Sequence, residues 1–235
     1  DWTSPIIASR HDPNTVYAAG NRLFISRDRG SSWSRTDDLS RQIDRDTLAI
    51  MGVAGADITI SRNDGTGSFG EAVALFESPV DPDVIWVGFD DGNLQVTRDG
   101  GGTWTEVSGN GFPTTEKGRI GLAVAPTRPN TVYAMVELPE GEGGFYRSTN
   151  AGESWERMSA ASSGSPQYYQ EIYVDLHDPN TIYSMDTFLQ VSRDAGRTWS
   201  QWGEANKHVD NHAWWQDPAD LEHILVGSDG GLYET

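Results

Sequence analysis

The sequence contains no cysteine, which excludes disulfide bonds and thiolate metal sites but leaves the cellular compartment open. It also lacks any apolar run near the roughly 20 residues of a membrane-spanning helix, so no membrane span is expected. Lysine is scarce, with only Lys117 and Lys207, and 35 acidic residues face 17 basic ones for a net charge of −18. An acidic surface repels phosphate backbones, so we expect no nucleic-acid partner. The same charge suits a divalent cation or a cationic partner, or is simply a solvated surface.

An eight-residue repeat of the form Ser/Thr-x-Asp-x-Gly-x-Ser/Thr-Trp occurs four times, starting at Ser26, Thr97, Ser148 and Ser192. Only the third copy departs from the form, with Asn150 in the Asp position. The Asp or Asn side chain can accept backbone N–H groups in a turn, and Gly supplies the positive φ of a hairpin reversal. We predict a structural role for the constrained positions, which are Asp28, Gly30, Trp33, Asp99, Gly101, Trp104, Asn150, Gly152, Trp155, Asp194, Gly196 and Trp199.

A second repeat precedes each of these turns. The stretch Asp12-Pro13-Asn14-Thr15-Val16-Tyr17 recurs at 81–86, 128–133 and 178–183, with a looser copy at 217–220. The separations from Pro to the following Trp of the turn are 20, 22, 26 and 20 residues. Such regular spacing predicts one supersecondary unit that is repeated along the chain.

The eight-residue repeat is the Asp-box, and the whole chain resembles the Asp-box (BNR) β-propeller proteins, which include sialidases, xyloglucanase-type glycosidases and sortilin-type domains. Phrases such as Tyr168-Tyr169, 208–212 and 227–233 resemble the sortilin-like or BNR "glycosyl hydrolase" subfamily of exported bacterial proteins. The resemblance implies an extracytoplasmic protein, whether periplasmic, at the cell surface or secreted. It also implies that the boxes lie between the third and fourth strands of each blade, away from the ligand site.

We therefore expect one all-β domain, a partial β-propeller with about four and a half blades of four antiparallel strands joined by Asp-box hairpins. The predicted blades are 4–37, 70–109, 119–160, 168–203 and an incomplete 210–235, with an insert at 38–69. Because the fifth repeat stops before its box, the chain is expected to be a segment of a larger propeller. The insert is either a functional loop or a short strand or helix packed on the propeller.

Candidate binding residues lie on the loops that lead into the innermost strands. His208, Asp210 and His212 alternate, so their side chains are expected on one face of an extended segment. Three alternatives stay open for them: a hydrogen-bonded structural cluster, a divalent-metal site, or acid–base chemistry. Trp214 follows on the same segment as a further binding candidate.

Tyr168 and Tyr169 precede the carboxylate of Glu171, and exposed aromatics beside a carboxylate often hold sugar rings or peptides. The alternative is that Tyr169 packs between blades. Sialidases need three arginines, whereas Arg119 is the one arginine well placed on these loops. The resemblance to xyloglucanase-type enzymes implies two catalytic Asp residues, one from each of two propellers; Asp210 is the best candidate for one, and its partner is absent from this segment. In a glycoside hydrolase Asp210 would act as acid or base, with Glu171 or His212 assisting.

The leading hypothesis is a binding module for a protein, peptide or glycan, because no complete catalytic set is visible in the sequence. The alternatives are a glycoside hydrolase and a structural subunit of an extracytoplasmic assembly that uses the insert for contact. No cofactor is expected, although a divalent cation would suit the His/Asp set. The remainder of a larger propeller chain is an expected partner.

Overall fold

The computed structural model describes residues 4–50, 53–58, 69–139, 143–203 and 205–235. These residues form six antiparallel sheets, four with four strands, one with three and one with two, and each strand pairs with its neighbours along the chain within its sheet. The first two sheets contain β1 (Ile6–Ala8), β2 (Val16–Ala19), β3 (Leu23–Ser26), β4 (Ser34–Arg35), β7 (Ala72–Glu77), β8 (Ile85–Phe89), β9 (Leu94–Thr97) and β10 (Thr105–Glu106). The third and fourth contain β11 (Ile120–Val124), β12 (Val132–Val136), β13 (Gly144–Ser148), β14 (Glu156–Ser159), β15 (Ile172–Val174), β16 (Ile182–Ser184), β17 (Gln190–Ser192) and β18 (Ser200–Gln201). The fifth contains β19 (Asn211–Gln216), β20 (Ile224–Ser228) and β21 (Gly231–Glu234).

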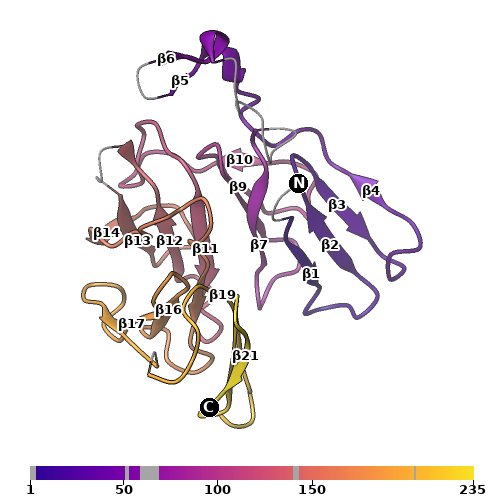
Figure 1. Ribbon diagram of the computed structural model, residues 1–235. Coiled ribbons are helices and arrows are strands. Elements are labelled where there is room, and N and C mark those ends of the chain that lie inside the picture. Colours follow the sequence, from indigo (N-terminus) through magenta and orange to yellow (C-terminus); the bar gives the residue numbers. More distant parts are fainter. Residues whose placement is uncertain (1–3, 51–52, 59–68, 140–142, 204) are drawn as a thin grey trace.

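The five larger sheets are blades of a β-propeller, arranged side by side around a shared hub (Figure 1). Residues of the first strand of every blade, from Ile7 on β1 to Gln216 on β19, line one central cavity. Four apolar clusters fill the four spaces between consecutive blades, the largest centred on Trp86, Ile120 and Tyr146. The predicted all-β propeller is confirmed: it has five blades, and the fifth has three strands.

The repeated turns (26–33, 97–104, 148–155 and 192–199) join the third and fourth strands of four blades. In the first turn, Oδ1 of Asp28 accepts the Ser32 amide at 2.7 Å, and Oδ2 accepts the Ser32 hydroxyl at 2.6 Å. The indole Nε1 of Trp33 donates to the Gly30 carbonyl at 3.1 Å, and Gly30 has φ +89°. Equivalent amide and indole bonds occur in the other three turns.

Each repeated turn is also bonded to the Pro-Asn or Pro-Asp turn of its own blade. In the four blades, the carbonyls of Asn14, Asp83, Asn130 and Asn180 accept an amide of the repeated turn at 2.8–2.9 Å. The two sequence repeats therefore keep a near-constant spacing because they meet at the same end of the blade. Antiparallel order places this end opposite to the one where the innermost strands begin.

The glycines of the third and fourth turns lie against the preceding blade. A Cβ added to Gly152 would collide with the Trp86 ring of the second blade, and one added to Gly196 would collide with the Phe145 ring of the third. Phe145 also contacts Trp199 edge-on, with ring centroids 5.0 Å apart. The turn therefore joins neighbouring blades as well as closing its own hairpin.

The insert between the first two blades contains two short 3₁₀ helices, η1 (Arg45–Thr47) and η2 (Gly55–Asp57), and a hairpin of β5 (Ala49–Ile50) and β6 (Val53–Ala54). Its first part is anchored, since Leu39 is buried and its carbonyl accepts the Asn93 amide nitrogen at 2.6 Å. Beyond this anchor the hairpin stands away from the blades (Figure 1). Residues 51–52 and 59–68 of the insert lie outside the described residues.

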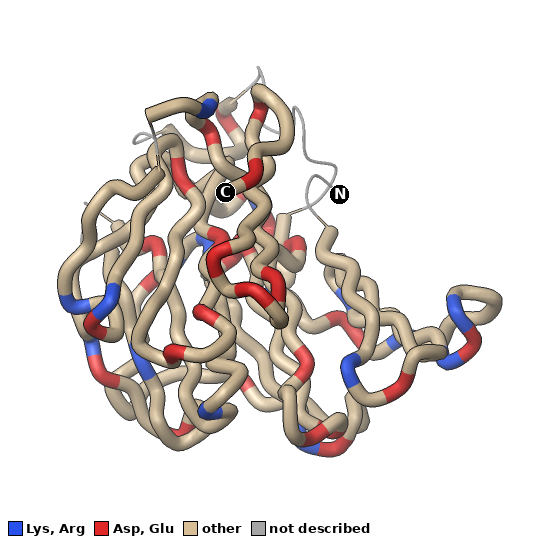
Figure 2. Tube along the Cα trace, turned by 90° about the horizontal axis from the view of Figure 1, so that it is seen from below, with Lys and Arg blue, Asp and Glu red and all other residues tan. Residues whose placement is uncertain are grey.

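Neither described helix is long and apolar enough to cross a membrane. The positions of Asp and Glu, red in Figure 2, are more frequent along the trace than the blue positions of Lys and Arg, in keeping with the net charge of −18.

Candidate functional site

The innermost strands β7, β11, β15 and β19 begin at the same end of the central cavity, which we call the mouth. At the mouth, the Tyr169 hydroxyl donates to Oδ1 of Asp210 at 2.5 Å. The His212 ring stacks on Tyr169 at 5.1 Å, and its Nε2 lies 3.1 Å from Oδ1 of Asp229. These four side chains, Tyr169, Asp210, His212 and Asp229, form the mouth cluster. It brings together two carboxylates, an imidazole and a phenol from the fourth and fifth blades.

The backbone at Asp210 differs from the extended segment that we expected. Asp210 has φ +66°, in the left-handed region, and β19 starts only at Asn211. The Asp210 amide donates to the Thr187 carbonyl at 2.9 Å, and the buried Asn211 side chain donates to the Asp186 carbonyl at 2.9 Å. These bonds to the β16–β17 loop fix the conformation. As a result, His208, Asp210 and His212 do not alternate along one straight strand.

His208 does not join the mouth cluster. Its Nδ1 pairs with the Val209 carbonyl at 2.7 Å, and its side chain lies against Gly230, where a Cβ would collide with it. In the described part of the chain, no group of three or more His, Asp or Glu side chains is arranged to hold a metal ion. His208, Asp210 and His212, the predicted metal candidates, therefore do not form such a group.

Tyr168 and Tyr169 differ sharply in exposure, at 52% and 6%. Their rings meet edge-on at 6.3 Å, so the exposed Tyr168 forms a rim beside the buried Tyr169. Burial and the hydrogen bond to Asp210 raise the pKa of Tyr169, which keeps its hydroxyl protonated and donating. The pair presents an aromatic face next to a fixed carboxylate.

Arg119 and Glu171, which line the cavity near the mouth, form an ion pair with Nη2 and Oε1 2.6 Å apart. The Arg119 side chain is only 6% exposed, and its Nη1 donates to the Gln167 carbonyl at 3.1 Å. Burial, followed by the charge of Glu171, raises the pKa of Tyr173 to about 12. One carboxylate oxygen of Glu171, Oε1, is thus paired with Arg119.

Gln170 lies between the third and fourth blades with φ +114°, a conformation that side chains rarely adopt. Its Nε2 donates to the carbonyls of Arg119 at 2.8 Å and Met135 at 3.3 Å. Its own carbonyl touches Gly121, where a Cβ would collide with it. Backbone strain of this kind costs about 1–3 kcal/mol and tends to occur at functional sites.

Trp214 lies in the packing between the fourth and fifth blades. Its ring stacks on Tyr183 with centroids 4.0 Å apart and meets Trp202 at 5.9 Å. Part of it also lines the cavity. The structure therefore places Trp214 in the wall of the hub and not at the mouth.

The sequence did not single out Asp229 or Gln170 as functional candidates. Asp229 occupies the β20–β21 hairpin, and the pairing of Asn211 with Ser228 brings that hairpin beside the start of β19. An Asp-Gly-Gly stretch at 229–231 indicates a hairpin turn, but its position at the mouth depends on strand register.

The central cavity has a volume of about 730 Å³. Its lining is mainly apolar strand residues, with Arg119, Gln170 and Glu171 near the mouth and Arg10 and Glu77 at the far end. This volume lies within the roughly 300–1,000 Å³ of small-molecule sites.

No protein-family model matches the chain. The oligoxyloglucan-reducing end-specific xyloglucanase of Emericella nidulans is 29% identical over 180 residues, which cover 72% of this chain and 19% of that protein. A xyloglucanase of Paenibacillus sp. is 23% identical over 193 residues, which cover 76% of this chain and 16% of that protein. The chain thus spans less than a fifth of the length of these relatives.

Among solved structures, an ancestral GH74 enzyme superposes with a TM-score of 0.65 at 17% identity, over 98% of this chain and 30% of that one. YCF48 from Cyanidioschyzon merolae gives a TM-score of 0.55 at 16% identity, over 98% of this chain and 65% of that one. At these identities the likeness concerns the fold. The sequence relatives are xyloglucanases, and the solved structures share the fold of this chain.

Proposed function

We propose that the chain is part of a glycoside hydrolase that acts on a glucan of the xyloglucan type, with Asp210 as one of its two carboxylates. The observation that carries the proposal is the Tyr169–Asp210 hydrogen bond beside the exposed ring of Tyr168. The xyloglucanase relatives support the substrate class. Aromatic faces beside carboxylates are the usual means of holding and cleaving sugar chains.

Glycoside hydrolysis uses two carboxyl groups separated by roughly 5–9.5 Å, depending on whether the anomeric configuration is retained or inverted. The mouth cluster contains two, Asp210 and Asp229. In this proposal Asp210, oriented by Tyr169, faces the scissile bond, and His212 orients Asp229 from 3.1 Å. Tyr168 holds the neighbouring sugar ring.

The repeated turns are proposed to be Asp-boxes of a sortilin-like or BNR propeller, on the strength of their recurring Asp, Gly and Trp bonds. We further propose that the protein acts outside the cytoplasm, where its glucan substrate occurs, and that further propeller chain contributes to the substrate cleft. The length of the xyloglucanase relatives supports this last point.

Activity of the full-length protein on xyloglucan oligosaccharides tests the proposal. Asp210→Asn should lower the release of reducing ends by at least 100-fold, because a neutral amide can neither accept a proton nor attack. Asp217→Asn, at the far end of the fifth blade, is the matched control and should retain activity. Absence of activity in the wild type, or an active Asp210→Asn variant, would refute the assignment.

Binding without hydrolysis is the second candidate. It is favoured by the likeness to YCF48, of which one structure, with a TM-score of 0.52, is described as bound to a D1 peptide. Saturable binding of peptides or glycans without turnover would support it.

A further inference from the structure

Arg119 holds both ends of the short stretch that carries the mouth tyrosines, residues 167–171, which we call the tyrosine segment. Arg119 precedes β11 of the third blade, whereas the tyrosine segment leads into β15 of the fourth. Nη1 of Arg119 donates to the Gln167 carbonyl at 3.1 Å, and Nη2 donates to Oε1 of Glu171 at 2.6 Å. One guanidinium group of the third blade therefore brackets the tyrosine pair of the fourth.

The tyrosine segment contains a backbone conformation that needs such support. Gln170 has φ +114°, and strain of this kind persists only where the surrounding structure fixes it. Its Nε2 donates to the Arg119 carbonyl at 2.8 Å, and its own carbonyl lies so close to Gly121 that a Cβ there would collide with it. Both partners belong to the start of the innermost strand of the third blade. The conformation of the segment thus depends on that blade.

Arg119 is itself fixed in position and shielded from water. Its amide donates to Oε2 of Glu137 at 2.9 Å, and its carbonyl accepts the Glu137 amide at 3.1 Å. Its side chain is only 6% exposed, so water competes little for the guanidinium bonds. Such bonds are stronger than those of an ion pair on the surface. The guanidinium group is therefore a rigid support for the tyrosine segment.

The placement of the segment decides whether the Tyr169 hydroxyl reaches Asp210. Their hydrogen bond is 2.5 Å long and joins the fourth and fifth blades. Because Tyr169 lies in the middle of the segment, a backbone shift of about 1 Å would stretch the bond to the limit of a hydrogen bond. A loosened segment should therefore leave Asp210 without its donor.

We propose that Arg119 is a positioning residue, which holds the tyrosine segment in the conformation that lets Tyr169 orient Asp210. In this role Arg119 acts through Tyr169 and does not itself touch the sugar. The expected effect on hydrolysis rests on the proposed function. The expected effect on the placement of Tyr169 does not.

NMR of the full-length protein with ¹³C-labelled tyrosine Cζ atoms tests the placement. The Tyr169 resonance is the one missing from Tyr169→Phe, and its position in Asp210→Ala marks the loss of the hydrogen bond. Arg119→Lys keeps the positive charge but cannot bond both partners at once, because an ammonium group lacks the planar fork of a guanidinium. In Arg119→Lys the resonance should shift toward its position in Asp210→Ala. An unshifted resonance would overturn the proposal.

Hydrolysis of xyloglucan oligosaccharides tests the route of action. Arg119→Lys should lower kcat roughly tenfold, the effect of losing one hydrogen bond. Because Arg119 acts through Tyr169, adding Tyr169→Phe to this variant should lower kcat no further, whereas independent effects would multiply to about 100-fold and refute the proposal. If the wild type shows no hydrolysis, the proposed function fails, and the Tyr169 resonance alone decides the role of Arg119.

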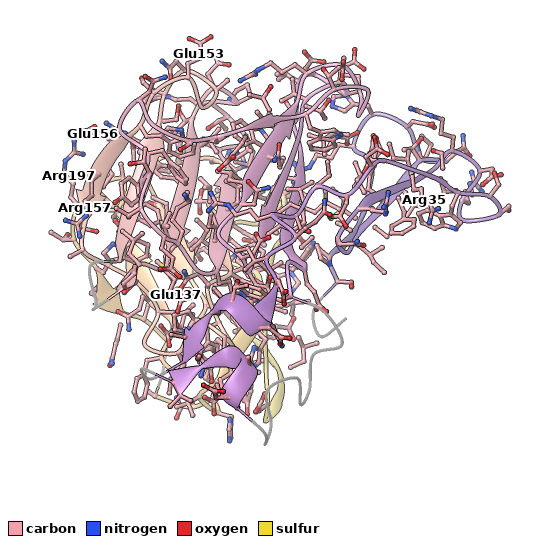
Figure 3. The ribbon with its side chains drawn as sticks, turned by 90° about the horizontal axis from the view of Figure 1, so that it is seen from above. Arg35, Glu137, Glu153, Glu156, Arg157 and Arg197 are labelled. Carbon is pink, nitrogen blue, oxygen red and sulfur yellow. The ribbon has the colours of Figure 1, made fainter. Side chains whose placement is uncertain are left out.

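Arg147→Lys is the matched control, since it alters a second Arg–Glu pair within the third blade. Nη2 of Arg147 lies 2.9 Å from Oε2 of Glu156, which is at the outer edge of that blade (Figure 3). Neither the Tyr169 resonance nor kcat should change in this control. A shift as large as that in Arg119→Lys would mean that the resonance reports general loosening, and the proposal would be wrong.

Glu171→Asp replaces Arg119→Lys if the latter does not fold. The shorter side chain should lose the 2.6 Å contact with Arg119 while the bond to the Gln167 carbonyl remains. A Tyr169 resonance that shifts toward its position in Asp210→Ala supports the proposal. A resonance that stays in its wild-type position overturns it.

Discussion

The Tyr169 hydroxyl lies 2.5 Å from Oδ1 of Asp210, although 41 positions separate the two residues along the chain. Tyr169 belongs to the loop before β15, and Asp210 to the loop before β19. The bond therefore joins the fourth and fifth blades at the mouth of the hub. It also fixes the carboxylate that we propose to be catalytic.

Tyr169→Phe should lower hydrolysis of xyloglucan oligosaccharides roughly tenfold, because Asp210 loses the donor that orients it, and should cost about 1 kcal/mol of stability. Tyr17→Phe is the matched control, since the Tyr17 hydroxyl donates to Glu77 at 3.0 Å at the opposite end of the hub. It should cost similar stability without changing turnover. Equal turnover of wild type and Tyr169→Phe would show that Tyr169 has no orienting role.

Gly196→Ala should destabilise the protein more than Gly203→Ala. Both glycines have positive φ, +87° and +72°, so both variants pay for a left-handed alanine. Only the Cβ at position 196 would collide with Phe145, while none of the described atoms lies within 4 Å of a Cβ at 203. Urea unfolding should show an additional loss of about 1–3 kcal/mol for Gly196→Ala, the usual cost of overpacking. Identical losses would contradict the contact between the fourth turn and the third blade.

Asp90→Asn should change how stability depends on pH. Burial, reinforced by the nearby Asp91 and Glu71 charges, raises the pKa of Asp90 from 3.8 to about 6. Between these values the folded state binds more protons than the unfolded state, so the wild type loses stability as pH rises through this window. The asparagine variant keeps an oxygen for the Gly70 and Glu71 amides but does not titrate.

Relative to wild type, Asp90→Asn should therefore be more stable by about 1 kcal/mol at pH 7.5, with the gain largely absent at pH 4. Chemical unfolding at the two pH values measures the difference. A variant that is less stable than wild type at pH 7.5 would mean that the Asp90 charge is favourable.

Asn150→Asp should restore the form of the other three repeated turns. Asn150 accepts a hydrogen bond from the Ser154 amide at 3.0 Å and donates one to the Ser154 hydroxyl. In the turns that contain Asp the amide bond is the same, but the hydroxyl donates to the carboxylate instead. In the second turn, hydrogen bonds from the Thr103 amide and hydroxyl lower the pKa of Asp99 to about 2. A carboxylate at 150 should thus stabilise the protein by less than about 1 kcal/mol at pH 7, and the gain should vanish as pH falls from about 4 to 2. Thermal unfolding at pH 7 and pH 3 tests this, and a loss at pH 7 would contradict it.

Local chemistry explains how much of the fold was predictable. The Asp, Gly and Trp of each repeated turn bond within eight residues, so the hairpins between third and fourth strands followed from the sequence alone. The contacts of Gly152 with Trp86 and Gly196 with Phe145 did not, because they depend on how one blade packs on another. The same limit applies to the insert, whose projecting hairpin has no sequence repeat to indicate its orientation.

The candidate site was predictable only in its general location. The loops before the innermost strands do meet at one mouth, and Tyr169 and Asp210 are brought together there. Asp210 and Gln170 have positive φ without being glycine, so packing against neighbouring blades decides their conformation. For that reason the alternation expected for His208, Asp210 and His212 is not found, and Gln170 was not singled out.

The contacts of the third and fourth repeated turns with the blade before them run in one direction around the ring. Gly196 of the fourth blade packs on Phe145 of the third, and Gly152 of the third blade packs on Trp86 of the second. Among the described turn glycines, none packs on the blade that follows its own. Fraying of one blade should therefore loosen its predecessor before its successor. We therefore expect backbone amides to lose their protection from hydrogen exchange blade by blade, in order toward the N-terminus.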